Sequence, residues 1–79
     1  MKTPRDISSD RLIQHLIRHW GYTVDSQRGS HIVLESDTPV KHSIPIPQRK
    51  AMGLGLFRAI LTQIGTAKGV SISDILRNL

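Results

Sequence analysis

The stretch SQRGSHIVLES, residues 26–36, decides the fold of the chain around it. Gly29 lies near its centre, and glycine is the residue that a hairpin turn needs where the backbone takes a positive φ. The segments 22–26 and 31–35 on either side alternate apolar and polar residues, with Tyr22 and Val24 apolar in the first, as in half-buried strands. We therefore predict two antiparallel strands joined by a tight turn, with His31 as the first residue after it.

A third short strand is predicted over residues 41–46, KHSIPI, after a second turn in SDTP, residues 36–39. Pro45 within it has no N–H to donate to a neighbouring strand. The sequence therefore places this strand at a sheet edge or gives it a bulge.

Residues 11–21, RLIQHLIRHWG, are predicted to form a helix that follows three capping residues at positions 8–10 and ends at Gly21. Apolar residues at helical spacing form one stripe, which consists of Leu12, Ile13, Leu16, Ile17 and Trp20. The aromatic side chains Trp20 and Tyr22 are both expected in the core. The polar side of this helix, expected to face solvent, consists of Arg11, Gln14, His15 and Arg18.

Residues 56–65, LFRAILTQIG, have the same helical spacing, and Gly65 is the expected end of this second helix. Ser71 and Asp74 form a pattern typical of a capping box and open a third, short helix over residues 72–79. The expected fold class is α+β: a single small domain with the order α-β-β-β-α-α, whose three-stranded antiparallel sheet is covered by helices on one face.

Size, charge and composition limit the functions that the chain could have. Domains of 79 residues bury only roughly 60% of their unfolded surface, so chemistry is expected in an open surface groove. Eleven Lys and Arg against six Asp and Glu give a net charge of +5, which favours a polyanion such as nucleic acid or an acidic protein as partner. Without cysteine there is neither a disulfide nor a thiolate metal site. The charged N-terminus and the absence of 18 consecutive apolar residues predict a soluble, cytoplasmic chain without a membrane segment.

Three short motifs stand out by their order and spacing: RGSH at residues 28–31, IPIP at 44–47 and GLFRAILTQIG at 55–65. Together they resemble the HicA family of bacterial toxins, the small ribonucleases of HicAB toxin–antitoxin systems. The resemblance covers residues 8–65, and residues 71–79 are similar to a tail helix of some members, so residues 1–79 are expected to form one HicA-like domain. It implies a variant of the double-stranded-RNA-binding fold, cleavage of messenger RNA, growth arrest, and neutralisation by a HicB-type antitoxin that covers the active face.

The resemblance also implies a catalytic residue. In the family the histidine of the Gly-Ser-His motif is catalytic, which assigns His31, with Gly29 and Ser30 as supporting motif residues. Many members carry further histidines at two places where this chain has Ile32 and Gln48. The remaining candidate for a second proton-transfer group is His42 on the third strand, which a three-stranded sheet could bring beside His31.

The chemistry of RNA cleavage is compatible with one histidine and no cofactor. RNA supplies its own nucleophile, the 2′-hydroxyl, so an enzyme needs a base and cations for the phosphate, and needs no metal. Imidazole, with a pKa near 6.5, suits the first role. Pattern alone, without the resemblance, would make His31 a polar residue on the solvent face of a strand. The candidate RNA-binding cations are Arg28, Lys41, Arg49, Lys50 and Arg58, for which ordinary solubilising charge is the alternative.

Two glycines and two further histidines have functional and structural explanations, and two other functions compete with RNA cleavage. Gly53 and Gly55 would let the backbone approach an anion at a helix N-terminus, or simply make the loop before that helix flexible. The spacing of His15 and His19 could suit a metal, but no third ligand is apparent nearby and surface histidines are expected. The competing functions are a non-catalytic RNA-binding module, in which His31 is only a contact residue, and an interaction domain for an acidic protein.

Overall fold

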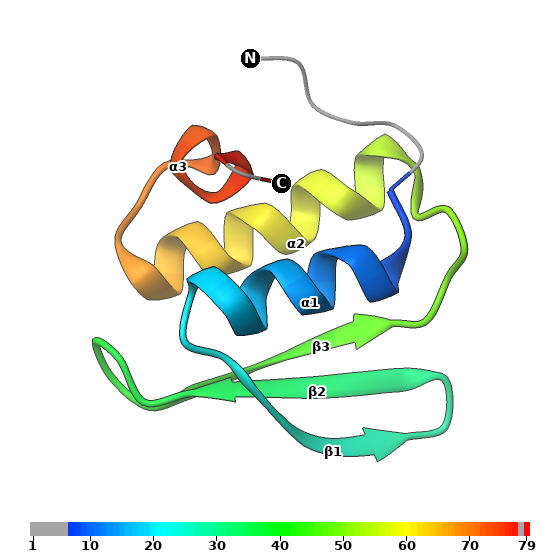
Figure 1. Cartoon of the computed structure of the whole chain (residues 1–79), viewed down its shortest axis with the longest axis horizontal. Coiled ribbons are helices and arrows are strands. Elements are labelled where there is room, and N and C mark those ends of the chain that lie inside the picture. The colour runs from blue at the N-terminus through cyan, green and yellow to red at the C-terminus, as the bar shows by residue number, and fades with distance from the viewer. Residues whose placement is uncertain (1–6, 78) are drawn as a thin grey trace.

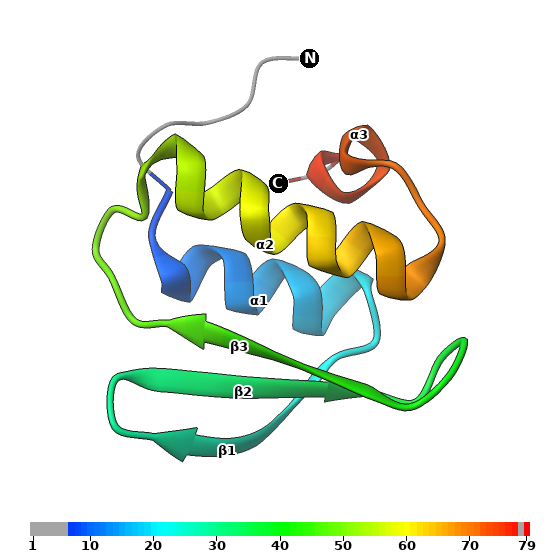
Figure 2. The ribbon, with the colours of Figure 1, turned by 180° about the vertical axis from the view of Figure 1, so that it is seen from behind.

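The computed structural model describes residues 7–77 and 79. The elements follow in the order α1 (Ser9–His19), β1 (Thr23–Arg28), β2 (His31–Ser36), β3 (His42–Pro47), α2 (Gly53–Lys68) and α3 (Ile72–Leu76). The strands form one antiparallel sheet in the order β1-β2-β3. Both α1 and α2 lie on one face of this sheet, and α3 lies against α2 farther from the sheet (Figure 1, Figure 2). The predicted α+β class, element order and single-face helix cover are confirmed.

The hairpin between β1 and β2 has the predicted form. Its turn consists of Gly29 and Ser30, and Gly29 has a φ of +60°. Along β2 the buried Leu34 and Ser36 face the helices, so the alternating residues His31 and Val33 face the open side of the sheet. β3 is an edge strand, as its Pro45 predicts. His31 therefore lies on the sheet face that none of the described helices covers.

The core lies between the sheet and the helices. α1 and α2 contact the sheet mainly at β3, and α3 packs against α2. Ser8 caps α1 by accepting a hydrogen bond from the Arg11 N–H, and the capping box of Ser71 and Asp74 is present at the start of α3. The largest completely buried side chains include Tyr22, Phe57, Leu12, Leu16, Leu34, Ile46, Leu61 and Ile75.

The predicted end of α2 at Gly65 is wrong. The helix continues to Lys68, and Gly69, with a φ of +70°, ends it. Gly65 is instead buried at the contact between α2 and the segment leading into α3. A Cβ on this residue would lie 2.8 Å from the backbone oxygen of Val70. Glycine is present here because the returning chain passes close to the helix, which local sequence does not reveal.

The predicted exposure of His15 is also wrong. His15 is only 5% exposed, and its Nε2 donates a hydrogen bond to the backbone oxygen of Ile75 at 2.6 Å. Ile17, predicted on the apolar stripe, is 40% exposed. His15 is buried because α3 lies over this side of α1. Trp20 is half-buried against the core and Tyr22 is fully buried, as expected.

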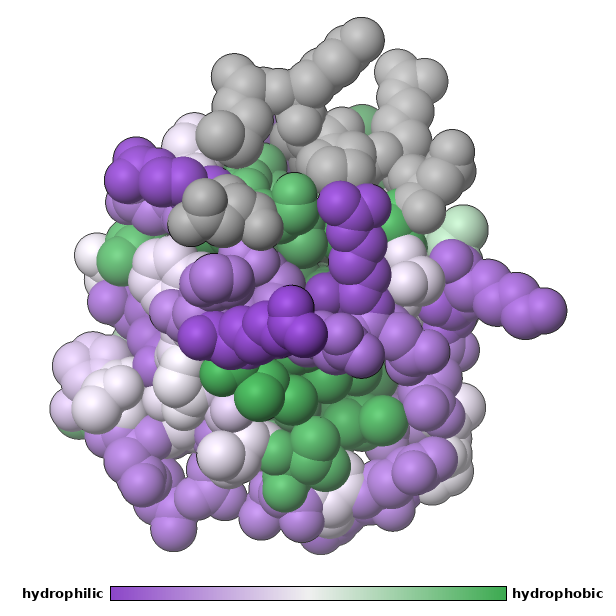
Figure 3. Space-filling model, in the orientation of Figure 1, coloured by the Kyte–Doolittle hydropathy of each residue, from purple (hydrophilic) through white to green (hydrophobic). Residues whose placement is uncertain are grey.

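Strand β1 is more exposed than its alternation predicts. Val24, expected to be half-buried, is 53% exposed because the helices contact the sheet mainly at β3 and leave this edge strand largely uncovered. Figure 3, in the orientation of Figure 1, shows apolar surface in green below the position of α1, in the region of the strands.

None of the helices in the described part of the chain has the length and apolar character needed to cross a bilayer.

Candidate functional site

The turn between β1 and β2 places His31 beside an arginine. Arg28, the last residue of β1, is the cross-strand partner of His31, the first residue of β2. Side chains at directly opposite positions share a face and have Cβ atoms about 4.5–5.5 Å apart. Both residues are exposed. An imidazole and a guanidinium thus stand next to each other on the open side of the sheet, in a register fixed by a two-residue turn.

The loop after β3 is attached to this turn. The Gln48 N–H donates to the Ser30 backbone oxygen at 2.7 Å, and the Gln27 side-chain amide donates to Gln48 Oε1 at 3.3 Å. On its other side His31 is paired with Pro47, the last residue of β3. The Gly-Ser-His turn is therefore held from two directions rather than projecting freely.

The start of α1 fixes the same loop. The Ser9 hydroxyl donates to the Pro47 backbone oxygen and accepts from the Arg49 N–H at 2.8 Å. The Ser9 N–H donates to the Arg49 backbone oxygen at 2.9 Å. Figure 1 shows the result: the β1–β2 turn, the loop between β3 and α2, and the N-terminus of α1 meet at one end of the molecule. We call this end the motif end.

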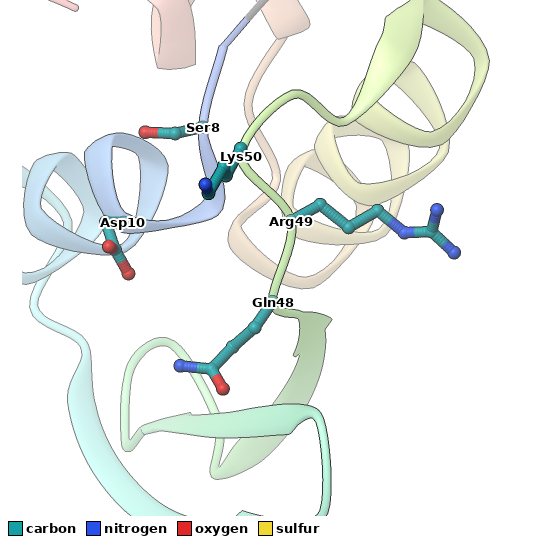
Figure 4. Close-up of a pocket in the computed structure, with 5 residues that line it drawn as sticks. All are labelled: Ser8, Asp10, Gln48, Arg49 and Lys50. Atoms are coloured by element: carbon teal, nitrogen blue, oxygen red, sulfur yellow. The ribbon is translucent and has the colours of Figure 1, made fainter.

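A depression of about 390 Å³ lies between the loop and α1 at the motif end (Figure 4). Its lining combines the cationic side chains of Arg49 and Lys50 with the carboxylate of Asp10. In Figure 4 the side chains of Arg49 and Lys50 leave the loop in different directions. The two cations therefore widen the basic surface of this end instead of enclosing a single ligand. The remaining lining residues are Ser8 and Gln48.

His31 belongs to a second depression, of about 490 Å³, on the open face of the sheet. The hydroxyl oxygen of Ser26 is buried here without a hydrogen-bond partner among the described residues. A groove of this kind, shallow and open, was expected for so small a domain. Its lining consists of Asp25, Ser26, Arg28, His31, Val33, Ser43 and Pro45.

The predicted RNA-binding cations are only partly brought together. Arg28, Arg49 and Lys50 lie at the motif end. Lys41 precedes the start of β3 at the opposite end of the sheet, where its Nζ lies 3.4 Å from Glu35 Oε1. Arg58 is exposed on α2, on the helix side of the sheet.

His42 does not lie beside His31, so the expected pairing of the two histidines is not met. The register pairs His42 with Ser36 and His31 with Pro47, at opposite ends of β2. At about 3.3 Å per residue the two histidines are separated by on the order of 17 Å, and they face opposite sides of the sheet. His42 Nδ1 donates to the Val40 backbone oxygen at 2.7 Å, and its Nε2 lies 2.8 Å from the Tyr22 hydroxyl. Both nitrogens are thus occupied within the fold.

A lysine that the sequence analysis did not single out holds the turn between β2 and β3. Lys68 Nζ donates to Ser36 Oγ at 2.6 Å and to the Thr38 backbone oxygen at 2.8 Å, and it lies 4.7 Å from the centre of the Tyr22 ring. Burial lowers the pKa of Lys68 and raises the pKa of Tyr22 to about 12. The sequence signal for this contact is a lysine in the last turn of a helix. Such lysines are common, so the signal does not identify the contact.

No group of three or more potential metal-ligating side chains comes together within residues 7–77 and 79. The rings of His15 and His19 lie 5.0 Å apart, but His15 is engaged with the backbone of α3. His15 therefore contributes to the packing of α1 against α3, and His19 is an exposed surface residue.

The chain is similar to a known family of proteins. A family model described as the HicA toxin of bacterial toxin–antitoxin systems matches residues 10–66. This range contains the Gly-Ser-His turn, all three strands and nearly all of α2, and it stops before α3. No curated protein and no solved structure gives a significant match to the chain.

Proposed function

The chain belongs to the HicA family of toxins of bacterial toxin–antitoxin systems, and from this premise we propose that it is an endoribonuclease that cleaves messenger RNA in the cytoplasm without a metal ion. The observation that carries the proposal is the exposed pair of Arg28 and His31, fixed by a two-residue turn that two other segments hold in place. The family membership implies a cognate antitoxin as partner.

His31 acts as the general base in the proposed reaction. Its imidazole takes the proton from a ribose 2′-hydroxyl, and the 2′-oxygen attacks the adjacent phosphorus. The bond from phosphorus to the 5′-oxygen breaks, which leaves a 2′,3′-cyclic phosphate and a 5′-hydroxyl. Because no second imidazole lies beside His31 in the described structure, a water molecule on this open face protonates the leaving oxygen.

Arg28 stabilises the charge that develops on the phosphate oxygens. A guanidinium donates paired hydrogen bonds to such oxygens and keeps its charge at all physiological pH values. Its position opposite His31 supports a role at the cleaved phosphate rather than at a distant one. We propose that Arg49 and Lys50 bind the neighbouring phosphates at the motif end, and that Arg58 and Lys41 lie outside this path.

The antitoxin is proposed to be of the HicB type and to cover the open face of the sheet at His31. An acidic surface on the antitoxin would complement the net charge of +5 and compete directly with RNA. Neutralisation then needs no change of conformation in the toxin, because the antitoxin occludes His31 and Arg28 at the same time.

The proposed activity is tested with purified protein and end-labelled single-stranded RNA in the presence of EDTA. The expected result is cleavage that EDTA does not reduce, with products that end in a 2′,3′-cyclic phosphate. RNA that is retarded in a gel but left intact would instead support a non-catalytic RNA-binding module. Absence of RNA binding at physiological salt would support an interaction domain for an acidic protein.

A further inference from the structure

The depression beside His31 contains a carboxylate where a phosphate-binding surface would not need one. Asp25 lines it together with Arg28 and His31. Its side chain is exposed and forms no hydrogen bond or ion pair with any described residue. A carboxylate repels RNA phosphates, so a surface that bound only the RNA backbone would be better without it. Asp25 therefore indicates a ligand group other than phosphate.

A β-bulge places Asp25 at this position. The register of β1 against β2 shifts between Val24 and Ser26, so that Asp25 is the inserted residue. Val24 is paired with the buried Leu34 on the helix side, whereas Ser26 is paired with Val33 on the open side. Without the bulge, residues 24 and 26 would share a face. The bulge thus turns Ser26 toward the open side and leaves Asp25 beside it, as bulges near functional sites often do.

The floor of the depression is apolar and can contact the flat face of an aromatic ring. Ser26, Val33 and Pro45 form one row across the three strands, and the last two residues of this row provide apolar surface. The pair of Arg28 and His31 lies two positions further along the strands, at about 6–7 Å. That separation is comparable with the one between a phosphate and the base of the same nucleotide. A base can therefore rest on Val33 and Pro45 while its phosphate contacts the Arg28–His31 pair.

Ser26 supplies a second polar group without a partner. Its hydroxyl oxygen is buried and makes no hydrogen bond within the described structure. Buried polar atoms in folded proteins nearly always have a partner, so an orphan at a surface depression points to a ligand. Ser26 lines the depression, so its hydroxyl is available to a bound base when the side chain turns toward it.

We propose, as an extension of the proposed RNA cleavage, that this depression binds the base next to the cleaved phosphate and that Asp25 selects a base with an amino group. An ionised carboxylate only accepts hydrogen bonds. Adenine, cytosine and guanine present an amino group to it, whereas uracil has a single ring N–H and no amino group. Asp25 is thus a specificity residue that discriminates against uracil at one position of the substrate.

The test measures binding of short single-stranded oligonucleotides of adenine, cytosine or uracil by fluorescence anisotropy. The protein carries His31→Ala, so that the RNA is not cut. Uracil oligonucleotides should bind weaker than the other two by about tenfold, the discrimination typical of a good polar contact to a base edge. In the additional variant Asp25→Ala this ratio should approach one, although all RNAs bind tighter because a negative charge is lost.

Asp37→Ala is the matched control, because it removes the same charge from an exposed residue after β2, at the other end of the sheet. It should leave the ratio unchanged. Ser26→Ala, a smaller change on an edge strand, should lower the ratio as well. Circular dichroism confirms that each variant is folded.

The inference is overturned if the His31→Ala protein shows no preference against uracil, if the additional change Asp25→Ala keeps the full preference, or if no RNA binds at all. Its failure differs from failure of the proposed function. A protein that cuts RNA through His31, with a base preference that Asp25→Ala does not alter, keeps the function and loses the base site. A protein that never cuts RNA but shows the Asp25-dependent preference loses the function and keeps the base site.

Discussion

Arg28 and His31 are cross-strand partners on the two sides of the turn between β1 and β2, and both side chains are exposed on the open face of the sheet. Their relative position is fixed by the register of the hairpin and by the hydrogen bond from the Gln48 N–H to Ser30. The pair joins an imidazole, which can accept a proton, to a guanidinium, which can donate paired hydrogen bonds to phosphate oxygens.

Substitution Arg28→Gln should lower the rate of RNA cleavage by about 10- to 100-fold, because it removes the cation beside the cleaved phosphate. The dependence of binding on salt should also weaken by about 0.7 in the logarithmic slope, the contribution of one phosphate in single-stranded RNA. Arg77→Gln is the control, since Arg77 is exposed on the far side of the helices, where it pairs with Asp74. Equal cleavage rates for the two variants would remove Arg28 from the site.

Tyr22 should make the fold less stable in alkaline solution. Its pKa is raised to about 12 in the folded chain, whereas an exposed tyrosine titrates near 10. The stabilisation is therefore complete below pH about 10 and is lost as the pH rises to about 12, by on the order of 2 kcal/mol. Denaturation by urea across this range should show the loss in the parent and not in Tyr22→Phe.

The pKa of Lys68 is lowered in the folded chain, so its titration changes stability in the direction opposite to that of Tyr22. Loss of the Lys68 proton raises the stability of the fold as the pH rises toward the ordinary pKa of lysine. Lys68 is present in both the parent and Tyr22→Phe, which removes its effect from the comparison. Parallel loss of stability in the two proteins would contradict the assignment to Tyr22.

Substitution Lys68→Met should destabilise the fold by about 1–3 kcal/mol, because it removes the shortest hydrogen bonds to the buried Ser36 hydroxyl and to the Thr38 backbone oxygen. Lys41→Met removes an ion pair between the exposed Lys41 and the partly buried Glu35 and should change stability by about 0.5 kcal/mol or less. The free energy of unfolding in urea distinguishes the two. A similar small effect for both would show that the Lys68 contacts do not hold the turn.

Two glycines of α2 should respond oppositely to alanine. Gly55→Ala adds a methyl group in open space and should stabilise the helix by about 0.5–1 kcal/mol. Gly65→Ala adds one 2.8 Å from the Val70 backbone oxygen and should destabilise the fold by about 1–3 kcal/mol. Thermal unfolding of both variants checks this, and stabilisation by Gly65→Ala would contradict the close packing of α2 against the chain that leads into α3.

Features encoded within a few residues were predictable from the sequence. The turn at Gly29, the edge position required by Pro45 and the capping box of Ser71 and Asp74 each depend on the conformational or hydrogen-bonding properties of neighbouring residues. The range over which local pattern suffices is about one turn of helix or one hairpin.

Features that depend on contacts between distant segments were not predictable. His15 is buried because α3 covers it, and Gly65 lies inside a helix because the chain after that helix returns to pack against it. The place of His42, far from His31, follows from the register of β3 against β2. The bulge at Asp25 leaves no mark in the alternation of residues 22–28, where only residues 22 and 24 are apolar.

The proposed function rests most directly on His31, and a comparison of two histidine variants tests it. His31→Ala should reduce the rate of RNA cleavage in EDTA by about 10²- to 10⁴-fold, the usual contribution of a positioned base. His19→Ala, which removes an exposed histidine from the other face of the molecule, should cleave at the rate of the parent. Cleavage by folded His31→Ala at the parent's rate would contradict the account.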